Sequence, residues 1–187
     1  MKIPAILPIK KTDRAKTRLA KELTQKERKS LVHGMFSHVW RTCLKAGLKP
    51  LAVTSDPVLL ERYGGLSDDG KGLNAAITKA LTTFGLGEFF IILPDLPLLE
   101  PQTLREIVNL NVSYVVCPDG RLKGTNIVYV EGFRKYSPQF GVDSFRKHLK
   151  QKRDAKIFYE IGTALDIDRP EDLSLLRSLS TRPSGEN

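Results

Sequence analysis

The stretch FFIILPDLP occupies residues 89–97. Residues 89–93 are continuously apolar, as expected for a central strand of a parallel sheet, because helices cover such a strand on both faces. The run leads directly to Asp95, so a carboxylate stands at the end of a buried strand. Ligands of open α/β sheets bind at the carboxyl ends of the strands. The stretch therefore predicts an α/β fold with a ligand site beside Asp95.

Apolar runs and helical patterns alternate along the rest of the chain. Further strands are expected at residues 3–9, 51–54, 112–117, 125–130 and 157–161. Helices are expected at residues 24–47, 57–64, 73–83, 101–110, 144–152 and 170–179. Thr24 and Glu27 form a capping-box pattern, and Ser144 is expected to cap its helix. This alternation predicts a three-layer α/β domain with a mostly parallel central sheet.

Length and composition indicate an ordinary globular chain. It has 187 residues, 41% of them hydrophobic and 27% charged, which is enough to bury one core without disulfides or a structural metal. We expect a single domain over residues 1–179 and a disordered polar tail at 180–187. No signal-peptide pattern and no apolar run of about 18 residues is present. We therefore expect a cytoplasmic protein without a membrane partner.

The cysteine content gives no sign of redox or metal chemistry. Cys43 and Cys117 form no CxxC pair and no Cys/His metal spacing, and large apolar residues flank both. We expect two buried, reduced thiols.

Positive charge is concentrated near the N-terminus. The chain has 30 Lys and Arg against 21 Asp and Glu, for a formal net charge of +9, and 13 of the basic residues lie in the first 50. A basic group between the first strand and the first helix consists of Lys10, Lys11, Arg14, Lys16 and Arg18. It favours a small anionic ligand. Nucleic acid is the alternative, but Phe89, Phe90 and Tyr114 lie in expected core strands, so we expect no nucleic-acid partner.

Two aspartates are the candidates for chemistry. Asp95 and Asp168 each follow an apolar strand or extended segment, although Asp168, two residues before Pro170, is an equally good helix N-cap. Mg²⁺ takes one or two carboxylates together with phosphate oxygens, so such a pair near Lys and Arg suits a nucleoside triphosphate. The histidines His33, His38 and His148 fall in expected helices, where we expect surface or hydrogen-bonded residues rather than catalysts.

Several common catalytic motifs are missing from the sequence. It contains no GxxxxGK[ST] loop, no GxGxxG after the first strand, no GxSxG and no HExxH. These absences disfavour simple ATPases, dinucleotide oxidoreductases, serine hydrolases and zinc peptidases.

Six short motifs, taken in order, resemble the archaeal 2-phospho-L-lactate guanylyltransferase family of coenzyme F-420 biosynthesis. They are ILPIK (6–10) with AKTRL (15–19), GLNAA (72–76), PDLP (94–97), GTN (124–126), FG (140–141) with Ser144, Phe145 and His148, and DIDRPEDL (166–173). The resemblance covers nearly the whole chain and implies a Rossmann-like nucleotidyltransferase fold of the nucleotide-diphospho-sugar transferase type. It also implies transfer of GMP from GTP to 2-phospho-L-lactate, release of pyrophosphate, and a homodimer.

The resemblance also implies roles for individual residues. Asp95 and Asp168 would hold Mg²⁺ and, with Lys10 and Lys16, form the catalytic set. The residues that face GTP would be Lys10, Arg14, Lys16, Arg18, Leu73 and Asn74, and the phosphorylated acid would meet Thr125, Gly141 and Ser144.

Several points stay open at this stage. Asp166 is a further candidate for the metal. Phosphoenolpyruvate and 3-phosphoglycerate present the same phosphate and carboxylate as 2-phospho-L-lactate. Another small-molecule nucleotidyltransferase, of the molybdopterin or sugar-phosphate type, is the alternative, although such enzymes usually carry a glycine-rich first loop that residues 8–13 lack.

Three residues depart from the pattern of the family. Pro94 precedes Asp95 where Gly is frequent, Asp143 precedes Ser144 where Gly is common, and Arg169 stands where Thr is frequent. A carboxylate beside a bound phosphate is repulsive unless it points away or pairs with a basic group. Asp143 therefore bears directly on the identity of the acceptor.

Overall fold

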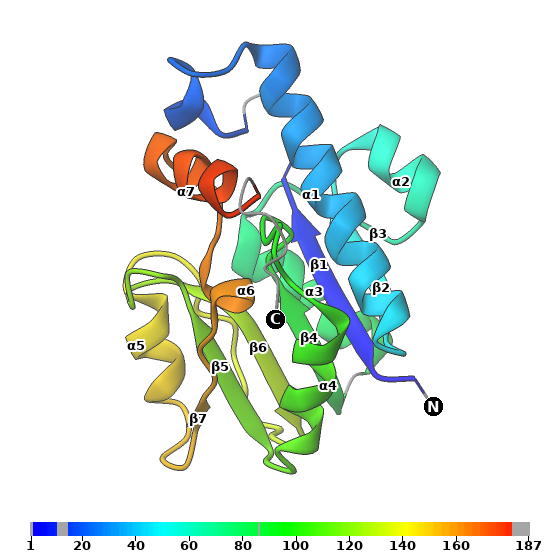
Figure 1. Ribbon diagram of the computed structural model, residues 1–187. Coiled ribbons are helices and arrows are strands. Elements are labelled where there is room, and N and C mark those ends of the chain that lie inside the picture. Colours follow the sequence, from blue (N-terminus) through cyan, green and yellow to red (C-terminus); the bar gives the residue numbers. More distant parts are fainter. Residues whose placement is uncertain (1, 11–14, 86, 181–187) are drawn as a thin grey trace.

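A seven-stranded sheet forms the centre of the computed structural model, which describes residues 2–10, 15–85 and 87–180 (Figure 1). The strands are β1 (Pro4–Ile9), β2 (Lys49–Thr54), β3 (Leu66–Ser67), β4 (Glu88–Ile92), β5 (Tyr114–Pro118), β6 (Thr125–Glu131) and β7 (Lys156–Ile157), in the order β3-β2-β1-β4-β6-β5-β7. Only β6 runs antiparallel to its neighbours β4 and β5 among the described strands. The expected mostly parallel sheet is confirmed.

Helices cover both faces of this sheet. They are α1 (Gln25–Lys45), α2 (Pro57–Tyr63), α3 (Leu73–Phe84), α4 (Pro101–Asn109), α5 (Ser144–Leu149), α6 (Ile161–Ala164) and α7 (Pro170–Ser180), with a short 3₁₀ helix η2 (Thr17–Leu19). On β4, Phe90 and Ile92 pack in one core with α1, α2 and α4, whereas Phe89 and Ile91 pack in a second core with α3 and α5. Each of these buried side chains contributes about 1.5–3 kcal/mol. The three-layer prediction is confirmed, and the continuous apolar run reflects burial of β4 on both faces.

Two helix starts follow their sequence patterns. Thr24 and Glu27 form the reciprocal capping box in front of α1. Asp56 accepts hydrogen bonds from the main-chain amides at the start of α2, and Pro57 occupies the first turn. These side chains take up amide groups that have no partner inside the helix.

Other local expectations were wrong. Ser144 is the first residue of α5, and the preceding cap position belongs to Asp143 in the left-handed conformation. The expected strand at 157–161 ends at Ile157, because Glu160 and Thr163 form a capping box that turns the chain into α6. A helix or strand of two or three residues is too short to show a hydrophobic period, so β3 and η2 were not foreseen.

A third apolar cluster brings distant segments together at the carboxyl edge of the sheet. It joins Leu19 of the η2 segment, Val32 and Met35 of α1, and Ile167 and Leu173 next to and within α7. Figure 1 shows α7 beside the blue segment that precedes α1. Residues 15–19 and 165–173 are thereby held close to one another, which places the basic and acidic motifs of the sequence analysis at one site.

Both cysteines are buried free thiols, as expected, and burial raises the pKa of Cys43 to about 12. Within the described ranges, no helix has both the length and the apolar character to cross a bilayer. Apart from Ser180, the tail expected at 180–187 lies outside the described residues, as do Lys11 and Arg14.

Gly65 provides a test of the β2–β3 edge. A Cβ at Gly65 would lie 2.2 Å from the main-chain oxygen of Ala52, and φ there is +123°, whereas Gly85 has a φ of +58° and open space around it. We expect Gly65→Ala to lower the free energy of unfolding by about 3 kcal/mol or more, since clash adds to strain. Gly85→Ala should cost about 1 kcal/mol from the left-handed backbone alone. Urea unfolding of both variants and the wild type measures the difference, and equal losses would contradict the close approach to Ala52.

Candidate active site

Side chains from three distant segments meet at the carboxyl end of β4. Asp95 follows β4, and its main-chain oxygen accepts the amide of Ile167 at 3.2 Å, which lays residues 166–168 beside it. Lys16 Nζ lies 2.6 Å from Asp95 Oδ2 and 3.6 Å from Asp168 Oδ1. Arg18 donates from Nη1 to Asp168 Oδ2. The four residues singled out from separate motifs therefore form one charged cluster.

Lys16 holds this cluster together. Its backbone has the left-handed conformation, with φ 53° and ψ 42°, at the start of η2. Burial alone would lower the pKa of Lys16, but the charges of Asp95, Asp168 and Asp166 raise it above its usual value. The ammonium group therefore stays charged and offsets the repulsion among the carboxylates.

The carboxylates fit a divalent cation. Oδ1 of Asp95 is buried and has no hydrogen-bond partner among the described residues, while Oδ2 already contacts the Lys16 ammonium. In the described part of the chain, no group of three His, Cys, Asp or Glu side chains forms a complete metal cage. Mg²⁺ does not need one, because phosphate oxygens and water complete its octahedron. Asp95 and Asp168 are thus suitable ligands for a metal that arrives with a nucleotide.

A third carboxylate lies in the same cluster. Burial raises the pKa of Asp166 to about 6, and the negative charge of Asp95 adds to this effect. Asn126 on β6 donates from Nδ2 to Thr163 O at 3.0 Å and reaches Asp166 Oδ1 at 3.5 Å. Asn126 belongs to the GTN motif but received no role from the sequence, although an amide inside a largely apolar strand must find buried partners. It fixes the loop that carries Asp166.

A cavity of about 400 Å³ opens beside the cluster, between the ends of β1 and β4. The strand order of the sheet changes direction between β1 and β4, and such a topological switch point is the usual ligand position in α/β folds. Lys10, Lys16, Asp95 and Asp168 line its polar part, and Leu73 belongs to its apolar part. A volume of this order is common for small-molecule sites. Leu73 and Lys10 therefore line one cavity, and their contact with a nucleotide stays a prediction.

A second cavity of about 320 Å³ adjoins the first, because Asp168 lines both. Its basic lining residues are Arg18, Arg121, Lys123 and Arg169. Gly141 and Asp143 also line it, whereas Thr125 and Ser144 are each only 2% exposed. Asp119, Asp166 and Asp168 line it as well, so its wall carries four basic and four acidic side chains, and Arg18 is paired with Asp168. The basic side chains are the groups of this cavity that bind anions.

Asn74 follows Leu73 of the first cavity and is bonded to Phe140, which precedes Gly141 of the second. Its Nδ2 donates to Phe140 O at 3.0 Å, and its Oδ1 accepts from the Phe140 amide at 2.8 Å. The side chain is thus committed to the loop that leads to Gly141. Contact of Asn74 with a nucleotide base stays a prediction.

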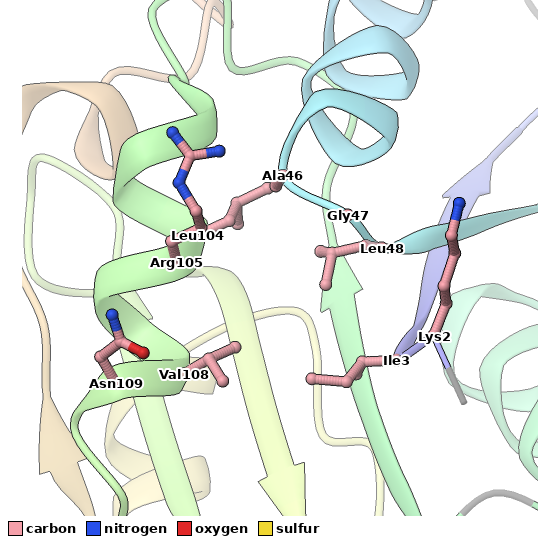
Figure 2. A pocket seen from close by; sticks show the side chains of 9 residues that line it. All are labelled: Lys2, Ile3, Ala46, Gly47, Leu48, Leu104, Arg105, Val108 and Asn109. Carbon is pink, nitrogen blue, oxygen red and sulfur yellow. The ribbon is translucent and has the colours of Figure 1, made fainter.

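A further cavity of about 300 Å³ lies at the opposite edge of the sheet (Figure 2). Ile3 and Leu48, which precede β1 and β2, line it together with Leu104 and Val108 of α4. The lining includes Lys2 and Arg105 but no acidic side chain, and Arg105 is bonded to the main-chain oxygen of Lys45. This cavity offers no metal ligands, so the carboxyl edge remains the candidate active site.

Comparison with known proteins identifies the family. Residues 2–178 match the family described as "Guanylyl transferase CofC like". The chain belongs to this CofC-like family. A curated relative, the 2-phospho-L-lactate guanylyltransferase of Methanocaldococcus infernus, is 33% identical over 180 residues, or 90% of this chain and 81% of the relative. The phosphoenolpyruvate guanylyltransferase of Rubrobacter xylanophilus is 32% identical over 195 residues, or 95% of each chain.

Solved structures agree on the fold of this CofC-like chain. A nucleotidyl transferase from Methanothermobacter thermautotrophicus has a TM-score of 0.65 at 16% identity, over 97% of this chain and 99% of its own. Rv0371c from Mycobacterium tuberculosis, solved as a complex with manganese, has a TM-score of 0.57 at 16% identity, over 97% of this chain and its full length. The chain therefore has the nucleotidyltransferase fold, and with its guanylyltransferase relatives it is a nucleotidyltransferase enzyme.

Replacement of Lys16 tests the charge balance of the site. Lys16→Met leaves Asp95 and Asp168 without their central cation, so we expect the free energy of unfolding without metal to fall by about 3 kcal/mol. Lys79→Met is the matched control, since the Lys79–Asp69 ion pair has the same 2.6 Å separation but is more exposed. The control should lose less than about 1 kcal/mol. Chemical unfolding in the presence of a chelator measures both, and equal losses would contradict a buried ion cluster.

Proposed function

We propose that the protein transfers the GMP group of GTP to the phosphate of 2-phospho-L-lactate, forming lactyl-2-diphospho-5'-guanosine and pyrophosphate in coenzyme F-420 biosynthesis. The observation that carries this proposal is the pair of adjoining cavities that share Asp168. One contains Asp95 and Lys16 at the strand ends, and the other has four basic and four acidic lining residues. Two neighbouring cavities, each with basic side chains in its wall, suit transfer between a triphosphate and a phosphorylated acid. The names of the relatives support guanine as the base and a phosphorylated acid as the acceptor.

The reaction needs no general base. A phosphate monoester has a second pKa near ~6, so the acceptor is largely a dianion at neutral pH. One of its oxygens attacks the α-phosphorus of GTP, and the bond from that phosphorus to the β-bridging oxygen breaks. Pyrophosphate leaves with the electron pair of that bond. Catalysis then consists of positioning two anions and stabilising the charge of the transition state.

Each residue of the site has a role in this proposal. Asp95 and Asp168 hold Mg²⁺, which offsets charge on the phosphate oxygens when it is bound. The manganese complex of a protein with the same fold supports a divalent cation in general. The triphosphate is bound by Lys10, Arg14, Lys16 and Arg18. The base contacts Leu73 and Asn74, and the acid is held by Thr125, Gly141 and Ser144.

Phosphoenolpyruvate is the second candidate acceptor. The Rubrobacter relative that is named for this substrate is nearly as similar to the chain as the methanogen relative, at 32% against 33% identity. Both acids carry a phosphate and a carboxylate on the same carbon, so the same cavity suits either.

We further propose that the enzyme acts in the cytoplasm as a homodimer, because the family that the sequence resembles is usually dimeric. Light scattering on the purified protein determines the mass of the assembly. A monomer at micromolar concentration would contradict the dimer and leave the proposed reaction unaffected.

Pyrophosphate release tests the reaction itself. The purified protein is mixed with Mg²⁺, one of the four nucleoside triphosphates, and 2-phospho-L-lactate, phosphoenolpyruvate or 3-phosphoglycerate. We expect release only with GTP and 2-phospho-L-lactate, since the site must recognise both anions. Release with GTP and phosphoenolpyruvate would establish the second candidate, whereas no release in any combination would contradict the guanylyltransferase proposal.

Asp95→Asn tests the metal ligand. The amide keeps the size of the side chain but removes its charge, so we expect turnover at saturating GTP and Mg²⁺ to fall by about 100-fold or more. Asp154→Asn is the control, because Asp154 is exposed and pairs with Lys152 away from both cavities. It should keep the wild-type rate. A wild-type rate for Asp95→Asn at saturating Mg²⁺ would show that Asp95 is not a ligand.

A further inference from the structure

Both ring nitrogens of His148 are bonded inside the protein. His148 lies on α5 and is completely buried. Its Nε2 accepts the main-chain amide of Gln139 at 3.1 Å, and its Nδ1 lies 2.9 Å from Thr125 Oγ1. The imidazole thus connects the start of β6 with the loop that leads to Gly141.

The Gln139 amide determines the tautomer of this ring. A main-chain N–H can only donate, so Nε2 carries no proton. Burial lowers the pKa of His148 to about 4, so the ring is neutral at pH 7. A neutral imidazole has one N–H, which must then lie on Nδ1, and Thr125 Oγ1 is therefore the acceptor of this hydrogen bond.

The hydroxyl hydrogen of Thr125 is left for another acceptor. In the hydrogen bonds of the described residues, the Thr125 side chain contacts only His148. Thr125 is 2% exposed and is not itself among the lining residues of the second cavity, but the adjacent Gly124 is. A buried hydroxyl donor without an acceptor is costly, whereas an anionic oxygen is a strong acceptor.

We propose that His148 is a positioning residue for the phosphorylated acid. The Gln139 amide fixes the ring proton on Nδ1, and this N–H donates to Thr125 Oγ1. The threonine hydroxyl hydrogen is thereby directed toward an anionic oxygen of the acid. This inference rests on the proposed function, because it assumes that the second cavity receives the phosphorylated acid. A neutral ring is suited to this role, since it orders a donor without adding charge.

The same ring also fixes the loop of the acceptor site. Gln139 is bonded to His148, and the next residue, Phe140, is bonded to Asn74 through both main-chain groups. The Phe140 ring packs edge-on against His148, with 4.8 Å between centroids. Gly141 follows directly, so His148 orients acceptor-site groups on two separate segments.

Two isosteric replacements separate the positioning role from a packing role. In His148→Asn, the amide nitrogen replaces Nδ1 and can still donate to Thr125, but the acceptor for Gln139 is lost. In His148→Gln, the side-chain oxygen replaces Nε2 and the donor to Thr125 is lost. Each variant removes one buried hydrogen bond, so both should lose comparable thermal stability.

The expected kinetic difference lies in the KM for the acid. His148→Gln should raise it about 10-fold or more, as expected for a misdirected hydrogen bond to a charged group. Its kcat and its KM for GTP should stay within about twofold, and His148→Asn should raise the KM for the acid by only about threefold or less. An equal rise in the two variants would overturn the proposal in favour of packing.

Thr125→Val provides the coupling test. If His148 acts through the Thr125 hydroxyl, His148→Gln should raise the KM for the acid no further in the Thr125→Val background. Independent, multiplying effects of the two substitutions would overturn the proposal.

A measurement without turnover separates this inference from the proposed function. Long-range ¹H–¹⁵N correlation of the imidazole in the wild-type protein should show a proton on Nδ1 and none on Nε2 at pH 7. Inorganic phosphate, used as the probe, should shift the Thr125 methyl resonance in the wild type and in His148→Asn, and less in His148→Gln. The opposite tautomer, or no phosphate shift in the wild type, would overturn the inference. Absence of guanylyl transfer with these NMR results intact would instead contradict only the proposed function.

Discussion

The ion cluster of Lys16 with Asp95 and Asp168 is the constraint on which the carboxyl edge of the molecule depends. The main-chain bond between Ile167 and Asp95 holds the carboxylates close, and Asp166 adds a third negative group whose pKa is raised by burial and by Asp95. Such a group is unstable without a cation nearby. Lys16 supplies one from a separate segment, which the apolar cluster around Leu19 and Ile167 holds in place. The fold therefore maintains a negatively charged site before any ligand arrives, as electrostatic preorganisation requires.

The two halves of the site are organised by different physical means. On the nucleotide side, charged groups balance one another across Asp95 and Asp168. On the acceptor side, the neutral side chains of Asn74 and His148 fix the loop before Gly141. Neutral groups suit that position because the wall of the cavity already carries four basic and four acidic side chains. Their hydrogen bonds set direction, and the surrounding charges attract the anion.

The sequence predicted those parts of the structure that local chemistry determines. The apolar run at 89–93 indicated a strand covered on both faces, and the Thr24–Glu27 pattern located the start of α1. Ser144 does not cap α5 as its residue type suggested, because a left-handed Asp143 takes the cap position. The segment at 157–161 does not continue as a strand, because the Glu160 capping box turns the chain into α6. The contacts of Asn126 and His148 join residues far apart in the chain, so no local period indicates them. The conformation of Lys16 depends likewise on its tertiary partners.

The three departures from the family pattern have physical explanations in this structure. The main-chain amide of Leu93 donates to Asn126 O and so continues the sheet beyond β4. A residue before proline favours this extended backbone. Pro94 therefore stiffens the chain between β4 and Asp95 without disturbing the sheet. Asp143 and Arg169 line the same cavity, so the carboxylate that would repel a phosphate is accompanied by an additional guanidinium. Relative to the neutral residues frequent at these positions, the two substitutions cancel in charge. The two departures therefore leave the net charge of the cavity wall unchanged, while opposite charges on this wall make the orientation of the acid more dependent on the directed hydrogen bonds of Thr125 and its neighbours.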